Sequence, residues 1–268
     1  MASPNLLKKY RTMRDFGGTP EPSGGKPKKT KLPIFVIQKH HASHLHYDFR
    51  LEMEGVLKSW AVPKGPSYDP TVKRLAMMTE DHPYDYAGFE GVIPAGNYGA
   101  GNVIIWDNGT WEFIEPGDDP VKAVQSGKLT FRLYGKKMFG EWALVKIKGR
   151  NGSKGNEWLL LKHRDEFAND KIDVTEVAPR SIISNRLVDE VSPKRQWQSN
   201  RPAARGTTLT VAEKLRAEER AKKPATTSKK RAPSRPRRAP SRAASSPSRS
   251  SRAGSPPKAR PTARRRPR

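Results

Sequence analysis

The sequence predicts an all-β fold, a small closed β-barrel with an N-terminal arm, short helices and a disordered basic C-terminal tail. Between Pro33 and Arg164, short segments alternate apolar and polar residues, as half-buried strands do. Glycine, proline or Asn-Gly interrupts these segments about every eight to twelve residues, which is typical of all-β domains. We favour a closed barrel because closure removes exposed sheet edges.

The first predicted element is a polar arm, residues 1–30, with one short helix at Leu6–Met13. A barrel domain follows over residues 31–186. Its predicted strands are Ile34–Gln38, Leu45–Met53, Gly55–Val62, Arg74–Thr79, Gly101–Trp106, Gly109–Ile114, Lys128–Leu133, Trp142–Ile147 and Trp158–Lys162. Asp107-Asn108-Gly109 predicts a hairpin between the fifth and sixth of them, because Asn-Gly favours a turn with positive φ. Short helices are predicted at Pro120–Ser126 and Ile183–Val191.

The C-terminal part of the chain changes in composition. Residues 187–220 are predicted to be a linker, with a helix at Thr210–Lys223. Residues 221–268 contain 17 Lys and Arg and no acid, and otherwise mainly Pro, Ser and Ala. Such a segment cannot bury enough apolar surface to offset its chain entropy, so we expect it to be disordered.

The net charge indicates a polyanionic partner. Lys and Arg total 52 against 27 acids, a formal charge of +25. A field of this size favours nucleic acid first and an anionic membrane surface second. The absence of cysteine excludes disulfides and thiolate metal sites. No apolar run has the length of a signal peptide or a spanning helix, so we expect a cytoplasmic, nucleoid-associated monomer without a membrane partner.

Histidines cluster at the start of the second predicted strand. Four of the six, at positions 40, 41, 44 and 46, lie within seven positions. Strand alternation puts Leu45, Tyr47, Phe49 and Leu51 on an apolar face, and His44, His46, Asp48, Arg50 and Glu52 on the other. A row of imidazole, carboxylate and guanidinium is unusual for an outer face. A His-x-Asp pair alone is more often a surface pair, but the clustering favours a functional site.

This face has the chemistry of a metal site beside a phosphate site. His46 and Asp48, two positions apart, bring nitrogen and oxygen ligands to one point, which suits zinc, manganese or iron. His40, before the bend at Ala42-Ser43, would complete a set of three. Arg50 cannot ligate a metal but suits a bidentate grip on phosphate.

Two further segments carry weaker signals. Arg74, Glu80 and His82 share a parity if the fourth strand runs on, and Arg with His can bind phosphate and deliver a proton to a leaving oxygen. Lys64, on a Pro-Lys-Gly-Pro turn, could reach the same anion, although turn lysines are mostly solvated. The glycine-rich loop at 88–101 lacks the Lys-Ser/Thr of a P-loop and precedes a strand, so we predict a structural connection there.

These segments, in this order, resemble the 3′-phosphoesterase module of bacterial DNA ligase D over about residues 6–186. The resemblance rests on YRTMRDF at 10–16, TPEP at 19–22, the segment from FVIQKH at 35–40 through Leu51-Glu52, SWAVPKGP at 59–66, TEDHP at 79–83, the loop at 93–101, IWD at 105–107 and WLLLKH at 158–163. It implies a small β-barrel that acts on the 3′ ends of DNA, or of RNA–DNA primers, and depends on a divalent metal, manganese foremost. Such an enzyme removes a terminal ribonucleoside and then the remaining 3′-phosphate, which leaves a 3′-hydroxyl for end joining.

By the same resemblance, His40, His46 and Asp48 would be the metal ligands. The residues expected to contact or activate the phosphate are Arg50, His82, Arg74, Lys64, Tyr86 and Glu80, with Arg14, Asp15 and Glu21 from the arm. His82 could protonate the departing oxygen.

Two features depart from the family pattern. His41 stands where a small or acidic residue is expected and could compete for the metal. No ligase or polymerase domain follows, so we expect a DNA ligase and an end-binding protein to act in trans. Two other readings stay open: a non-haem iron oxygenase that uses the two histidines and Asp48, although its distal histidine usually lies far downstream, and a non-catalytic nucleic-acid-binding barrel.

Overall fold

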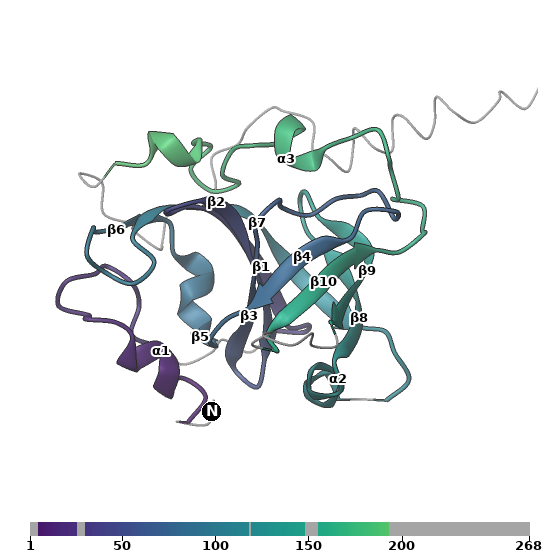
Figure 1. Ribbon diagram of the computed structural model, residues 1–268, viewed down its shortest axis with the longest axis horizontal. Coiled ribbons are helices and arrows are strands. Elements are labelled where there is room, and N and C mark those ends of the chain that lie inside the picture. Colours follow the sequence, from purple (N-terminus) through teal and green to yellow (C-terminus); the bar gives the residue numbers. More distant parts are fainter. Residues whose placement is uncertain (1–4, 26–29, 118, 148–154, 193–268) are drawn as a thin grey trace, which may run out of the picture. The chain divides into compact units, whose positions relative to one another are not determined.

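Eight antiparallel strands close into a barrel in the computed structural model, which describes residues 5–25, 30–117, 119–147 and 155–192 (Figure 1). In spatial order they are β1 (Ile34–His41), β2 (Leu45–Met53), β3 (Val56–Val62), β4 (Arg74–Met78), β10 (Glu157–Lys162), β9 (Phe139–Lys146), β8 (Lys128–Tyr134) and β7 (Gly101–Phe113), and β7 pairs with β1. Two short strands extend the sheet: β5 (His82–Pro83) pairs with β3, and β6 (Gly91–Ile93) pairs with β7. The predicted all-β barrel is confirmed.

Short helices complete the described residues. They are α1 (Lys8–Thr12), the 3-10 helix η1 (Tyr84–Gly88), α2 (Pro120–Ser126), α3 (Val174–Val177) and the 3-10 helix η2 (Val188–Glu190). The helix α2 has the predicted bounds because its ends are well signalled. Asp119 accepts hydrogen bonds from the first-turn amides, Pro120 occupies the first position, and Gly127 closes the helix at φ 88°. None of the helices in the described ranges is long and apolar enough to cross a membrane.

Large aromatic side chains fill the barrel. Five tryptophans are fully buried, Trp60, Trp106, Trp111, Trp142 and Trp158. They follow from the alternation of the strands: on β10, for example, Trp158 and Leu160 point inward while Leu159 and Leu161 point outward. Truncating one such side chain to alanine costs roughly 3–5 kcal/mol, so the barrel is a rigid support for any site on its wall.

A second apolar layer covers the outside of part of the barrel. Leu7 and Tyr10 of the N-terminal segment, with Tyr86 and Phe89, pack on outward-facing residues such as Val36. Both faces of β1 are therefore buried, since Phe35 and Ile37 fill the barrel interior. This layer places the outer faces of β1, β2 and β3 beneath the N-terminal segment, and the candidate site lies in that space.

The predicted Asp107-Asn108-Gly109 hairpin is wrong, because β7 runs unbroken through it. The Asp107 carboxylate accepts hydrogen bonds from the backbone amides of Lys136 at 3.0 Å and Met138 at 2.7 Å, so it organises the β8–β9 turn. Gly109 lies against this turn, where an added Cβ would come within 2.1 Å of the Tyr134 carbonyl oxygen. A glycine is needed here because two segments of the backbone approach closely, and not because the φ angle is positive.

Other elements differ less from expectation. The strand β2 has the predicted bounds, whereas β1 continues to His41. Leu45 is exposed because it sits at the end of its strand. The helix predicted at Ile183–Val191 is reduced to η2, and α3 was not predicted. The helix predicted at Thr210–Lys223 and the basic tail at 221–268 lie outside the described residues.

Candidate active site

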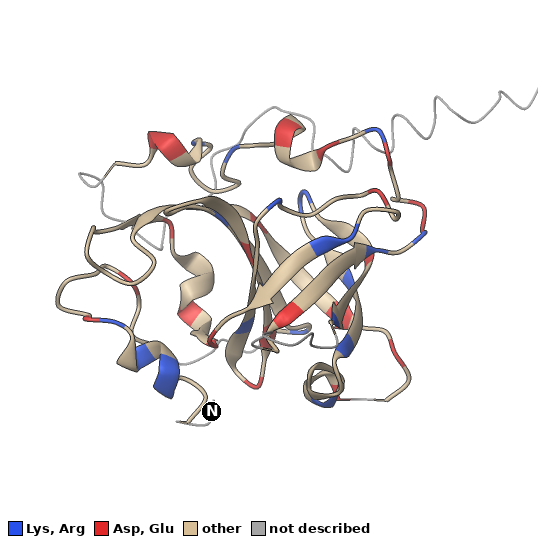
Figure 2. Cartoon of the chain, viewed as in Figure 1, with Lys and Arg blue, Asp and Glu red and all other residues tan. Residues whose placement is uncertain are grey.

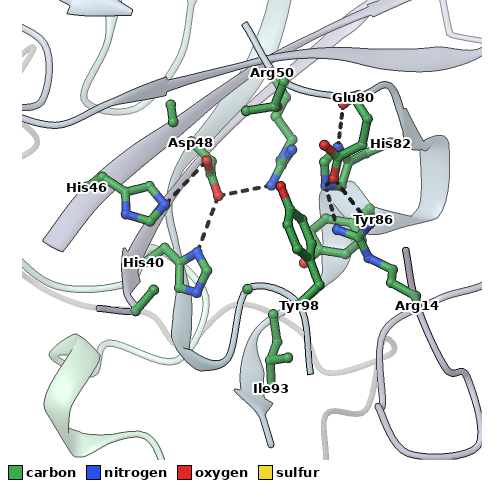
Figure 3. Close-up of a pocket in the computed structure, with 14 residues that line it drawn as sticks. Arg14, His40, His46, Asp48, Arg50, Glu80, His82, Tyr86, Ile93 and Tyr98 are labelled. Carbon is green, nitrogen blue, oxygen red and sulfur yellow. Dashed lines mark hydrogen bonds and ion pairs between the residues drawn. The ribbon is translucent and has the colours of Figure 1, made fainter. Parts of the chain in front are cut away.

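Three potential metal ligands meet on the outer face of β1 and β2. His40 lies opposite His46 in the antiparallel ladder, and Asp48 follows two positions later, so all three side chains share one face. Ligand atoms of the three lie within 4.8 Å of one another (Figure 3). Asp48 stands between the rings: Oδ2 is 3.6 Å from Nδ1 of His40, and Oδ1 is 3.6 Å from Nε2 of His46.

The hydrogen bonds of these side chains suit a divalent cation. Nδ1 of His46 lies 2.9 Å from the carbonyl oxygen of His44, which fixes the ring and leaves Nε2 free to face Asp48. Nε2 of His40 is buried and has no hydrogen-bond partner among the residues described. Two imidazole nitrogens and a carboxylate form a donor set that zinc, manganese and iron accept. The residues present therefore fit a metal ion.

Arg50 holds Asp48 in place. Its Nη2 donates to Oδ2 of Asp48 at 3.0 Å, its Nε to Gln38 at 2.8 Å and its Nη1 to Ser59 at 2.8 Å. Burial alone would raise the pKa of the Asp48 carboxyl, but Arg50 and the two histidines outweigh burial and hold that pKa well below its usual range. Asp48 is therefore ionised, as a ligand must be. Within the described part of the chain, three of the five N–H groups of Arg50 make hydrogen bonds, so two remain for an anion.

The N-terminal segment supplies a second arginine. Arg14 donates to Glu21 at 2.9 Å and to Glu80 at 3.1 Å, and its Nη2 lies 3.2 Å from Nε2 of His82. Its side chain is buried, and its guanidinium packs over the Tyr10 ring at 3.9 Å. The arm is thus part of the wall of the site.

His82 is neutral in this arrangement. It is buried, its Nδ1 lies 2.9 Å from the Glu80 carbonyl oxygen, and its Nε2 faces a guanidinium N–H of Arg14. Burial, together with Arg50 and Arg14, lowers the pKa of His82 well below its ordinary value. The geometry indicates that Nδ1 carries the proton and that Nε2 accepts from Arg14, so His82 positions Arg14 in the free protein.

These groups line one pocket of about 290 Å³. Its lining includes Arg14, His40, His46, Asp48, Arg50, Glu80, His82 and Tyr86 (Figure 3). The less polar part of its wall comes from Ala42, Ala61, Ile93, Tyr98 and Gly99. The pocket combines a metal-ligand set with two guanidinium groups, which is the chemistry of a phosphate site.

Comparison with known proteins identifies this architecture. Residues 38–146 match the family described as DNA Ligase D 3'-phosphoesterase domain. The chain carries a DNA ligase D 3′-phosphoesterase domain. The resemblance drawn from its motifs is confirmed.

Two relatives of the phosphoesterase-containing chain illustrate the match. It is 50% identical over 210 residues to the multifunctional non-homologous end joining protein LigD of Pseudomonas aeruginosa. The aligned region covers 77% of this chain and 24% of that protein. It is 44% identical over 174 residues to the multifunctional non-homologous end joining DNA repair protein LigD of Mycobacterium tuberculosis. This aligned region covers 65% of the chain and 22% of that protein. The chain thus spans about a quarter of the length of these relatives.

Within this phosphoesterase domain, the pocket gathers most of the site residues expected from the sequence. Glu21 lies just behind the lining, where it accepts from Arg14 and from the Tyr86 hydroxyl at 2.9 Å. The Tyr86 hydroxyl is thereby committed to Glu21. Asp15 does not line the pocket, because its carboxylate turns back to accept from the Gly17 amide at 3.0 Å.

Lys64 and Arg74 also lie outside the lining of the pocket. Lys64 is exposed on its turn. The expected shared parity of Arg74 with Glu80 and His82 is wrong because β4 ends at Met78 and His82 belongs to the separate strand β5. The strand alternation puts Arg74 on the face of Ala76, which packs in the barrel core.

Two further outcomes concern neighbours of the ligand set. His41 does not join it: alternation turns its ring to the opposite face of β1, where Nδ1 lies 2.6 Å from Oδ1 of Asp189. Tyr98 and Gly99 belong to the glycine-rich loop that was predicted to be only structural, yet both line the pocket. The sequence signal for Tyr98 was an aromatic residue flanked by glycines on the loop, with nothing to show which way the loop folds.

Proposed function

We propose that this domain hydrolyses phosphate esters at the 3′ ends of DNA, with a divalent metal, manganese foremost, held by His40, His46 and Asp48. One observation carries the proposal: a fitting metal-ligand set shares a small pocket with two buried arginines. The relatives, named for non-homologous end joining and DNA repair, support DNA as the substrate. The formal charge of +25 supports a polyanion.

Each group of residues has a distinct part in this proposal. A divalent cation held by the ligand set supplies Lewis-acid stabilisation of charge on a phosphate oxygen. Arg50 keeps Asp48 ionised and directs its two remaining N–H groups at the anion. Arg14, oriented by Glu21, Glu80 and His82, adds positive charge on the opposite side of the pocket. Fixed donors of this kind stabilise the charge that grows in phosphoryl transfer.

The substrate we propose is a primer strand that ends in a single ribonucleotide or in a 3′-phosphate, and the product is a 3′-hydroxyl that a DNA ligase can use. The pocket volume lies near the lower end of the roughly 300–1,000 Å³ typical of small-ligand sites. This volume is larger than a phosphate group alone would fill. A terminal nucleotide fits this size better than a duplex does.

A direct assay tests the function. A 5′-labelled primer-template that ends in 3′-phosphate or in one 3′-ribonucleotide is incubated with the protein and manganese, and conversion to the 3′-hydroxyl is followed on a gel. We expect conversion of both ends, and none with His46→Ala. If the protein binds the DNA tightly but leaves both ends unchanged, the barrel is a non-catalytic nucleic-acid binder.

A further inference from the structure

The glycine-rich loop between β6 and β7 presents an exposed aromatic ring to the pocket. Tyr98 is 48% exposed, and Arg14 lies over its ring at 5.4 Å. Figure 3 shows the ring between the metal-ligand set and the Arg14–His82 side of the pocket. By contrast, Tyr86, the other tyrosine of the lining, is buried with its hydroxyl bonded to Glu21. Within the described part of the chain, Tyr98 is thus the aromatic side chain that the pocket offers to a ligand.

The loop holds Tyr98 in a defined position. Gly96 and Gly99, at φ 90° and 75°, let the chain turn on both sides of it. The Asn97 side chain donates to the Gly18 carbonyl at 3.3 Å and to the Pro94 carbonyl at 3.2 Å, so the loop is fastened to the N-terminal segment. The Tyr98 hydroxyl has no hydrogen-bond partner among the residues that the structure describes. The loop therefore fixes the position of the Tyr98 ring, although no hydrogen bond of the Tyr98 hydroxyl within the described residues accounts for a tyrosine there.

The lining of the pocket is of two chemical kinds. The two histidine ligands, Asp48 and Arg50 stand on the barrel wall and Arg14 on the N-terminal segment, and a phosphate would bind among these groups. Tyr98, Ile93 and Ala42 also line the pocket and offer no charge to an anion. With the phosphate at the polar groups, the remaining space receives whatever is esterified to that phosphate. An aromatic ring with open surface binds a nucleobase by stacking, without regard to its sequence.

We propose that Tyr98 stacks on the nucleobase of the terminal, departing nucleotide and so favours nucleoside diester ends over phosphate monoester ends. This inference rests on the function proposed above. A 3′-phosphate end has nothing beyond the phosphate to contact the ring, whereas a terminal ribonucleotide fills the space beside it. Tyr98 is in this view a specificity-determining residue.

Kinetics with Tyr98→Ala and Tyr98→Phe test the proposal. From the usual contribution of one base–aromatic stack, we expect Tyr98→Ala to lower kcat/KM for a 3′-ribonucleotide end by about 5- to 100-fold more than for a 3′-phosphate end. Tyr98→Phe retains the ring and should keep the wild-type ratio. Tyr134→Ala is the matched control, because Tyr134 is similarly exposed, at 43%, on β8 and does not line the pocket.

An abasic substrate makes the test specific. When the terminal ribose carries no base, the selective effect of Tyr98→Ala should disappear, whereas removal of the penultimate base should preserve it. Equal losses of Tyr98→Ala on both kinds of end, or a dependence on the penultimate base, would overturn the proposal.

A binding measurement separates this inference from the proposed function. Fluorescence anisotropy of the same ends in EDTA reports affinity without turnover. If the wild type hydrolyses neither end, the proposed function fails. A terminal-base preference in binding that Tyr98→Ala abolishes would still support the stacking role, and its absence would overturn it.

Discussion

The guanidinium group of Arg14 lies 3.1 Å from the carboxylate of Glu80, a residue 66 positions away along the chain. Arg14 comes from the N-terminal segment and Glu80 from the connection between β4 and β5. Both side chains are buried, with 4% and 3% exposed. The pair therefore joins the arm to the barrel at the pocket, and the arm is a structural part of the site.

Replacing Arg14 with alanine should impair both activity and stability. The loss of one positively charged donor to the phosphate should lower kcat by about 10²- to 10³-fold. The substitution also leaves Glu21 and Glu80 buried without their partner, which should cost roughly 3–5 kcal/mol of unfolding free energy. Single-turnover kinetics and urea unfolding measure the two effects. Arg11→Ala, an exposed arginine on the preceding helix α1, is the control; equal behaviour of the two variants would show that the arm is not part of the site.

Substitution of His46 and of Asp48 should have the same effect on metal binding and activity but different effects on stability. We expect His46→Ala and Asp48→Ala each to abolish manganese binding, measured by calorimetry, and to abolish 3′-phosphate removal. Asp48→Ala should also lower stability more than His46→Ala, because it leaves the buried Arg50 charge unpaired. His44→Ala, exposed at the β1–β2 turn, is the control. Manganese affinity that survives in His46→Ala would contradict this ligand set.

Strand alternation carried much of the sequence prediction. It placed Tyr47, Phe49 and Leu51 in the core and His46, Asp48 and Arg50 together on the other face, because a period of two is fixed by the backbone. Because the chain turns between His40 and His46, alternation along the two strands also puts their side chains on the same face of the sheet.

The prediction was weakest where distant segments meet. Asn108-Gly109 has the composition of a hairpin, but contact with the β8–β9 turn overrides that local preference. The same limit applies to Tyr98 and to Arg74, whose positions depend on how a loop folds back and on where a strand ends. Periodicity contains no information about either.

The buried His82 should make stability depend on pH. Its folded-state pKa lies well below its unfolded value of about 6.5. Between these two pKa values the unfolded chain binds a proton at His82 and the folded protein does not, so acid favours unfolding. The resulting stability is fully present above about pH 6.5 and is lost as the pH falls toward the folded pKa. Urea unfolding at pH 7.5 and 5 should show a steeper loss for wild type than for His82→Asn. The partly exposed His163, changed to Asn, should keep the wild-type slope; a parallel slope for His82→Asn would refute the explanation.

The basic segment at 221–268 should bind DNA without affecting the chemistry. Its 17 Lys and Arg have no acidic residue near them in sequence, so they can contact phosphates electrostatically. Each phosphate neutralised on duplex DNA contributes about 0.9 to the slope of log affinity against log salt. Titrations of the full chain and of residues 1–220 at several salt concentrations should therefore differ in slope, while single-turnover rates at saturating DNA agree. Equal slopes would mean that this segment is not a nucleic-acid arm.

Lys137 should stabilise the attachment of the segment that follows α3 to the barrel. Its Nζ is buried, lies 4.7 Å from the centre of the Trp106 ring, and donates to the carbonyl oxygens of Ala178, at 2.8 Å, and Arg180. Burial lowers the pKa of this amine, and the carboxylate of Asp107 opposes that shift. The hydrogen bonds of this amine thus tie the segment after α3 to the β8–β9 turn.

Lys137→Met keeps the length of the side chain and removes these donors. The Ala178 carbonyl still accepts from the Trp106 indole at 2.7 Å, but the Arg180 carbonyl loses its bond to Lys137. An unsatisfied buried acceptor costs roughly 1–3 kcal/mol, so we expect the free energy of unfolding to fall by that amount. Limited proteolysis should then cut the chain near Arg180 sooner than in wild type. The neighbouring Lys136 is exposed, and Lys136→Met should change neither readout. If the two methionine variants unfold at the same urea concentration, the segment is held by its apolar contacts, such as Val188 against Ile104, and not by the lysine.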